Sequence, residues 1–154
     1  MLVPPYLRMD NGNLEPVTKD FIREYLTEAI EYYLDTLKDN YVNLLSTEEV
    51  VSNTLASMKF LLLNEEYLIA YTIQEDWLSS DKTLNEEFIY RVTPSSGTTL
   101  TDVVNTLSLL GLLHDCVAIE VSTAAIQNKQ AARRLYERSG LQETYTVMRK
   151  KVHG

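Results

Sequence analysis

The segment from Asn128 to Leu141 constrains the fold most strongly, because it contains all the parts of one short helix. Asn128 is placed to cap the first turn, where its side-chain oxygen would accept a backbone N–H. Gly140 stands where a left-handed residue ends a helix, and Leu141 follows as the hydrophobic partner of that cap. An apolar stripe at helical spacing lies between them and consists of Ala131, Ala132, Leu135 and Tyr136. Tyr136 therefore brings the only polar group to the expected buried face.

Length and composition indicate one globular domain spanning residues 1–154. The chain has 154 residues, of which 45% are hydrophobic, enough to bury a core. No apolar run approaches the ~20 residues of a membrane span, and the first residues lack the pattern of a signal peptide. Cys116 is the only cysteine, and the two histidines show no Cys/His spacing, so we expect neither a disulfide nor a metal. We expect a cytoplasmic protein, and the sequence leaves its oligomeric state open.

The net charge of −8 is distributed unevenly along the chain. Residues 1–90 hold 17 acidic and 6 basic residues, a net charge of −11, whereas residues 91–154 hold 5 and 8, a net charge of +3. The acidic half argues against a nucleic-acid partner, because neutralising phosphates requires clustered Lys and Arg. The basic half suits an anionic ligand. Solvated faces that mainly set solubility explain the same charges, and we favour that interpretation.

Hydrophobic periodicity divides the chain into ten elements. In chain order we expect a strand over 6–9, helices over 18–37 and 46–58, strands over 59–63, 67–74 and 86–93, a helix over 100–110, a strand over 117–121, a helix from 128, and a last strand over 144–152. Residues 10–13 form a turn and residues 77–84 a polar connection. The order β-α-α-β-β-β-α-β-α-β predicts an α/β fold with a mixed sheet flanked by helices.

The segment from Asn128 resembles the C-terminal helix of the GNAT superfamily of acyl-CoA N-acyltransferases, which typically reads N-x-x-A-x-x-L-Y-E-x-x-G-F. Counted back from Gly140, the family positions fall on Ala132, Leu135, Tyr136 and Glu137, whereas Asn128 lies one residue too far upstream. Residues 118–121, Ala-Ile-Glu-Val, are similar to the L-E-V strand of members that acetylate protein N-termini. The expected order of elements also agrees with the GNAT order. The resemblance implies a GNAT-like domain that transfers an acetyl group from acetyl-CoA to a primary amine, such as a protein or peptide N-terminus.

Tyr136 and Glu120 are the candidate catalytic residues. The resemblance implies that Tyr136 is the acid that protonates the leaving thiolate; a core tyrosine bonded to a backbone carbonyl is the other interpretation. Glu120 lies in a strand expected to be covered on both faces, where desolvation would raise its pKa and make it a general base. An ion pair with Arg91 explains this carboxylate equally well, and Glu87 is an alternative base. Glu120 and Tyr136 are 16 residues apart, about four more than is usual in the family, which predicts an enlarged loop over 122–127.

Residues 92–102 cover the position where the family binds the pyrophosphate of coenzyme A, in a loop resembling V-x-P-x-x-[RQ]-x-x-G-x-[GA]. Val92 matches its start, but Gly97 stands at the Arg/Gln position, and Leu100 and Asp102 replace the two glycines. In one interpretation, the hydroxyls and amides of residues 95–99 replace the glycine loop. In the other, Thr99 and Asp102 form a capping box that occupies the amides and adds a carboxylate.

The candidate cofactor-binding residues are Val92, Ser96, Gly97, Thr98, Thr99, Ser122, Asn128 and Arg133. We therefore expect acetyl-CoA as co-substrate and an amine acceptor that is cationic or a peptide, without nucleic acid or membrane partners. His114 is expected to be solvated at a helix end. The alternative function is a catalytically inactive GNAT-fold binding or structural protein, for example a viral or regulatory component. An acidic mimic of nucleic acid is a third, weaker possibility.

Overall fold

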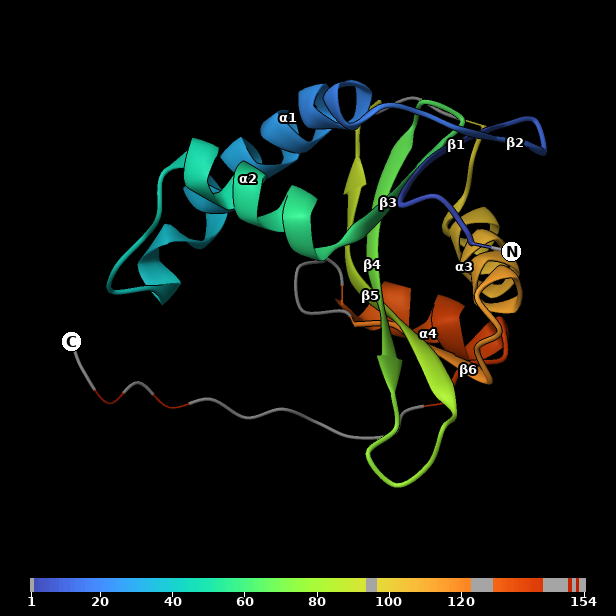
Figure 1. Cartoon of the computed structure of the whole chain (residues 1–154). Coiled ribbons are helices and arrows are strands. Elements are labelled where there is room, and N and C mark those ends of the chain that lie inside the picture. The colour runs from blue at the N-terminus through green and yellow to red at the C-terminus, as the bar shows by residue number, and fades with distance from the viewer. Residues whose placement is uncertain (1, 94–96, 123–128, 143–149, 151, 153–154) are drawn as a thin grey trace.

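The computed structural model describes residues 2–93, 97–122, 129–142, 150 and 152. Within them, six strands form one mixed sheet with helices on both faces (Figure 1). The expected mixed α/β fold is therefore confirmed. The expected last strand over 144–152 lies almost wholly outside the described residues, and so does the expected helix cap Asn128.

The elements follow one another as a hairpin, two helices, three strands and then alternating helices and strands. Their bounds are β1 (Tyr6–Asp10), β2 (Asn13–Pro16), α1 (Lys19–Leu37), the 3₁₀ helix η1 (Lys38–Asn40), α2 (Thr47–Ser57), β3 (Lys59–Leu63), β4 (Tyr67–Glu75), β5 (Lys82–Arg91), α3 (Leu100–Leu113), β6 (Ala118–Glu120) and α4 (Lys129–Arg138). The strand order in the sheet is β2-β1-β3-β4-β5-β6. The β1–β3 and β5–β6 pairs are parallel, and the other pairs are antiparallel.

The helices of the N-terminal half begin where their capping residues require. The hydroxyl of Thr18 accepts the backbone N–H of Phe21, and α1 starts at Lys19, directly after Thr18. Ser46 and Glu49 form the predicted capping box of α2, in which each side chain accepts the other's backbone N–H. These bonds satisfy amides that a helix leaves unpaired in its first turn.

The strands differ from the expectation most in two places, at β2 and at the start of β5. The turn at residues 10–13 is present, with Asn11 and Gly12 at positive φ, but it leads into the unexpected strand β2. All four β2 residues are exposed, so this strand lacks the alternation that marks a half-buried strand. β5 begins at Lys82, so the expected connection over 77–84 is wrong for its last three residues. They pair with the end of β4, and Leu84 is fully buried.

The sheet separates two apolar clusters. On one face, α1 and α2 pack through Ile22, Leu26 and Leu55 against sheet residues that include Phe60. On the other face, α3 packs through Val103, Leu107 and Leu110 against residues of β1, β3, β4 and β5. Gly111 lets α3 approach β6, because a Cβ there would lie 3.1 Å from Cγ2 of Ile119. No helix in the described ranges is long and apolar enough to cross a membrane.

We expect Phe60→Ala to lower the free energy of unfolding by about 3–5 kcal/mol, because it opens a cavity at a fully buried position facing α1 and α2. Chemical denaturation of both proteins measures this difference. Leu44→Ala is the control, since Leu44 is 45% exposed and its truncation should change stability by less than about 0.5 kcal/mol. Equal effects of the two changes would contradict the described core.

Candidate active site

β5 and β6 diverge after only three paired positions. Their parallel register joins Thr83 to Ala118, Leu84 to Ile119 and Asn85 to Glu120, and it ends there. Beyond this point, the backbone N–H of Ser122 donates to Oε2 of Glu86 over 3.1 Å. The side-chain carboxylate of Glu86 thus accepts a backbone N–H from the segment that follows β6. We call the end of this pairing the β5–β6 divergence, and Glu86 lies just beyond it.

A bulge in β5 sets the direction of Glu86. Tyr71 of β4 stands opposite Glu86, whereas the preceding residue, Ala70, stands opposite Phe88, so Glu87 is an extra residue. Directly opposed residues share a face of a sheet, and Tyr71 belongs to the cluster on the α3 face. Glu86 therefore lies on the α3 face, whereas Phe88 beyond the bulge packs on the α1 face.

Glu86 is a buried carboxyl group that titrates near neutral pH. It is 9% exposed, and burial raises its pKa from the ordinary 4.5 to about 7. The N–H of Ser122 opposes this rise, and the neighbouring charge of Glu87 adds to it. Glu87 itself is exposed and accepts the hydroxyl of Thr72 over 2.7 Å. Of the two adjacent carboxylates, the buried one has the pKa suited to proton transfer at neutral pH.

Tyr136 projects from α4 into the same region. It is 4% exposed and packs against Val104 of α3, with Leu100, Val121 and Leu141 around them. Its buried hydroxyl has no hydrogen-bond partner in the described part of the chain. Burial raises the pKa of this phenol, and the charge of Glu86 raises it further. The hydroxyl therefore stays protonated over the physiological range and is free to donate to a ligand.

The end of α4 fixes the position of Tyr136. Gly140 has a φ of 93°, and the N–H of Leu141 donates to the carbonyl of Tyr136 over 3.0 Å. The N–H of Gly140 donates to the carbonyl of Glu137, which completes the predicted glycine cap. Leu141 then packs beside the Tyr136 ring, as a hydrophobic cap partner should.

The expected burial of Glu120 is wrong. β6 is the outer strand on this side among the described strands, and both Ala118 and Glu120 are exposed. The proposed ion pair with Arg91 is also wrong, because Glu120 stands opposite Asn85, six strand residues or about 20 Å from Arg91. Arg91 instead donates to the carbonyl of Thr93 and lies over the ring of Tyr67. A catalytic role for Glu120 stays a prediction.

His114 also differs from the expectation of a solvated side chain. It is half-buried at the C-cap of α3, and its Nε2 lies 3.1 Å from the hydroxyl of Tyr71. The two rings meet edge to face with centroids 5.6 Å apart. Burial lowers the pKa of His114. This pair ties the end of α3 to β4.

The N-terminus of α3 is closed by side chains of the protein. Thr99 and Asp102 form the predicted capping box, in which Oδ2 of Asp102 accepts the N–H of Thr99 over 2.8 Å. The N–H of Thr98, which is 8% exposed, donates to Oε2 of Glu66 over 3.0 Å. The chain's own carboxylates thus occupy both amides that precede the helix.

The other predicted cofactor residues lie in different settings. The N–H of Val92 donates to the carbonyl of Glu66 over 2.7 Å, and Gly97 is exposed. Arg133 is exposed on α4 and forms an ion pair with Glu137 over 3.2 Å. The structure brings Ser122 into contact with Glu86, with Tyr136 nearby. It brings the consecutive residues Thr98 and Thr99 into contact with Glu66 and Asp102. The positions of Ser96 and Asn128 fall outside the described residues.

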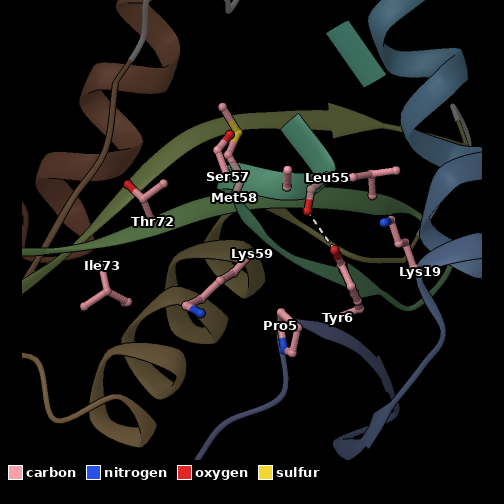
Figure 2. Close-up of a pocket in the computed structure, with 10 residues that line it drawn as sticks. Pro5, Tyr6, Lys19, Leu55, Ser57, Met58, Lys59, Thr72 and Ile73 are labelled. Carbon is pink, nitrogen blue, oxygen red and sulfur yellow. Dashed lines mark hydrogen bonds between the residues drawn. The ribbon is translucent and has the colours of Figure 1, made fainter. Parts of the chain in front are cut away.

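A separate cavity of about 340 Å³ lies beside the end of α2, next to β1, β3 and β4 (Figure 2). The hydroxyl of Tyr6 crosses it to donate to the carbonyl of Leu55 over 2.7 Å. Lys19 and Lys59 line it, so it favours anions over cationic amines. None of the predicted site residues line this cavity, and we assign the chemistry to the β5–β6 divergence. No group of three or more potential metal ligands occurs in the described ranges.

Comparison with known proteins supports the architecture. No protein-family model matches the sequence, and no curated protein matches it. Several solved structures are similar in fold. A Pyrococcus furiosus protein provisionally named an acetyl transferase has a TM-score of 0.60 at 19% identity, with 84% of this chain and 95% of that chain covered.

Two further similar structures are aminoglycoside acetyltransferases from uncultured soil metagenomic samples. HMB0005 has a TM-score of 0.60 at 14% identity, with 89% of this chain and 95% of that chain covered. Meta-AAC0020 in complex with sisomicin has a TM-score of 0.60 at 9% identity, with 89% and 93% covered. At these identities the likeness establishes the fold: the chain has the GNAT-like architecture of acetyltransferases.

Glu86 was not among the site residues predicted from the sequence. Residues 84–88, Leu-Asn-Glu-Glu-Phe, contain two adjacent carboxylates in a strand, and regular alternation does not assign Leu84 and Glu86 to the α3 face while Phe88 faces α1. A bulge reconciles these directions. Two adjacent acidic residues at the point where the alternation of apolar residues moves from one face of the strand to the other are the signal that would have indicated Glu86.

We expect Glu86→Gln to change how stability depends on pH. Because the pKa of Glu86 in the folded protein is about 7 and its ordinary value is 4.5, the folded state binds the proton more tightly. This stabilisation is complete below pH ~4.5 and is lost as the pH rises through about 7, a difference of up to about 3 kcal/mol. Urea denaturation at a series of pH values should show wild-type stability falling across this window relative to Glu86→Gln.

Glu87→Gln is the matched control, because it removes a neighbouring but exposed carboxylate. This variant should retain most of the wild-type loss of stability, with its midpoint at a lower pH because the charge of Glu87 contributes to the raised pKa of Glu86. Parallel pH profiles for wild type and Glu86→Gln would contradict the burial of Glu86.

Proposed function

We propose that the protein transfers an acetyl group from acetyl-CoA to a primary amine. The observation that carries this proposal is the pair of groups at the β5–β6 divergence: a buried carboxyl whose pKa is about 7, and a buried, unpartnered phenol whose pKa the charge of that carboxyl raises. Perturbed carboxylates and unpartnered buried hydroxyls are typical of catalytic sites. The likeness in fold to solved acetyltransferases supports the same chemistry.

Glu86 is the proposed general base. An alkyl amine holds an extra proton at neutral pH and must lose it before its lone pair can attack a carbonyl carbon. With a pKa of about 7, Glu86 is about half ionised at pH 7 and can accept that proton at Oε1 or Oε2. The Ser122 N–H holds the carboxyl beside the divergence throughout.

Tyr136 is the proposed hydrogen-bond donor to the departing sulfur. Its pKa is raised above that of a thiol, so it stabilises the sulfur mainly by holding a proton toward it. The charge of Glu86 contributes to that rise. Once Glu86 holds the amine's proton, its charge is gone and Tyr136 becomes a stronger donor. The two groups thus change state in the order that the reaction requires.

The residues fit one end of the donor better than the other. Acetyl-CoA supplies an acyl carbon activated by its thioester. The buried and unpartnered hydroxyl of Tyr136 fits the thioester end. The N-terminus of α3 does not fit the pyrophosphate end, because Glu66 and Asp102 hold its amides.

A cationic amine suits the charge of the helices beside the sheet. The outward face of α1 is exposed and carries Glu24, Glu28, Glu31 and Asp35. Such a face attracts cations over a distance of about one Debye length, ~8–10 Å. Two of the similar structures are named for aminoglycoside acceptors, which carry several amines. We therefore propose a cationic amine or the N-terminus of a peptide as the acceptor.

Thiol release from acetyl-CoA tests this proposal, with sisomicin and a lysine-containing peptide as acceptors. We expect wild-type kcat/KM to rise with pH through about 7, because ionised Glu86 is the active form. Glu86→Gln should lower it at least about 100-fold, and Tyr136→Phe at least about tenfold. Glu87→Gln is the control that keeps most of the wild-type activity, with its pH profile moved to lower pH because the charge of Glu87 contributes to the raised pKa of Glu86. Full activity in both Glu86→Gln and Tyr136→Phe would refute these roles.

The second candidate is a GNAT-fold binding protein without catalysis. The closed N-terminus of α3 favours it, because a fold can persist after its site is lost. Thermal unfolding with and without acetyl-CoA separates the two candidates, since a ligand of the folded state raises the midpoint. An unchanged midpoint at millimolar acetyl-CoA would favour the binding protein over the enzyme.

A further inference from the structure

The turn between β3 and β4 is fastened to the segment between β5 and α3. Asn64 and Glu65 adopt positive φ values of 50° and 55°, which turn the chain toward that segment. The N–H of Val92 donates to the carbonyl of Glu66 over 2.7 Å, and the hydroxyl of Thr93 donates to the carbonyl of Glu65 over 3.1 Å. Two hydrogen bonds from the segment after β5 therefore hold the backbone of Glu65 and Glu66.

The side chain of Asn64 adds two hydrogen bonds that connect the β3–β4 turn to other segments. Its Oδ1 accepts the N–H of Asn11 in the β1–β2 turn over 3.0 Å, and its Nδ2 donates to the hydroxyl of Thr98 over 3.0 Å. Thr98 is 8% exposed, although it precedes a helix at the protein surface. The carboxylate of Glu66 thus reaches the Thr98 amide from a position that several hydrogen bonds define.

Two carboxylates together take the place that an anion would occupy at α3. Glu66 accepts the N–H of Thr98, and Asp102 accepts the N–H of Thr99. The N–H of Asp102 in turn donates to Oγ1 of Thr99 over 3.3 Å. Free amides and the positive end of the helix dipole are what attract a phosphate, and the two carboxylates weaken that attraction by holding the amides just before the helix. A pyrophosphate would also meet two like charges.

We infer that Glu66 and Asp102 exclude the pyrophosphate of coenzyme A, so that the site recognises an acetyl thioester through its pantetheine arm alone. This inference rests on the proposed acetyl transfer and narrows its donor. The donor class is then any pantetheine thioester, with the adenine nucleotide contributing little to binding. Acetyl-CoA and S-acetylpantetheine should bind the wild-type protein with dissociation constants within about threefold of each other.

Calorimetric titration of the full chain with both thioesters tests this inference. In Glu66→Gln/Asp102→Asn, the charges are removed while both side chains keep an oxygen that accepts an amide N–H. We expect this variant to bind acetyl-CoA at least about tenfold more tightly than wild type and S-acetylpantetheine unchanged. Glu65→Gln is the matched control, because it removes one charge from the same turn without touching either amide, and it should change neither affinity.

Each outcome has a distinct meaning. If wild type binds acetyl-CoA more than about tenfold more tightly than S-acetylpantetheine, the inference is overturned and the proposed acetyl transfer stands. If wild type binds neither thioester but Glu66→Gln/Asp102→Asn binds acetyl-CoA, the exclusion is supported and the proposed transfer fails. If no protein binds either thioester, both fail. The wild-type comparison needs no variant, so a folding defect in the double variant leaves the test intact.

Discussion

The end of the pairing between β5 and β6 is the constraint on which the site depends. Where the pairing of two parallel strands ends, the backbone amides beyond it have no strand partner and take other acceptors. Here the carboxyl of Glu86 accepts the N–H of Ser122. The bulge at Glu87 turns that carboxyl toward α3, where burial raises its pKa to about 7. Burial thus gives Glu86 a pKa suited to proton transfer, and the backbone N–H, which opposes that rise, holds the carboxyl in place.

The same fold handles a second set of free amides differently. At the N-terminus of α3, the amides of Thr98 and Thr99 bind carboxylates from Glu66 and Asp102. This arrangement stabilises the helix and weakens its attraction for an external anion. Tyr136 packs against α3 and keeps an unpartnered hydroxyl, whereas the amides that precede the same helix are bonded to carboxylates. Catalytic groups and cofactor affinity need not be retained together.

Local sequence signals predicted the helices well, because a cap is made by residues three positions apart. Thr18, Ser46 and Thr99 cap helices as expected, and Gly140 ends α4 as expected. The burial of Glu120 was predicted wrongly, since the position of a strand in a sheet is not encoded in the strand itself. Glu86 escaped prediction because a bulge depends on the register between β4 and β5. Tyr136 was found through its motif, whereas its lack of a hydrogen-bond partner depends on how α3 and α4 pack.

The titration of the Glu86 carboxyl is the most direct measurement of this account. Carbon-13 NMR of protein labelled at the glutamate side-chain carboxyl follows each group separately, and the Glu86→Gln variant identifies the signal. We expect a midpoint near pH 7, with a shift of the Tyr136 ring resonances over the same range. A midpoint near the ordinary value of 4.5 would show a solvated carboxylate and contradict the proposed base.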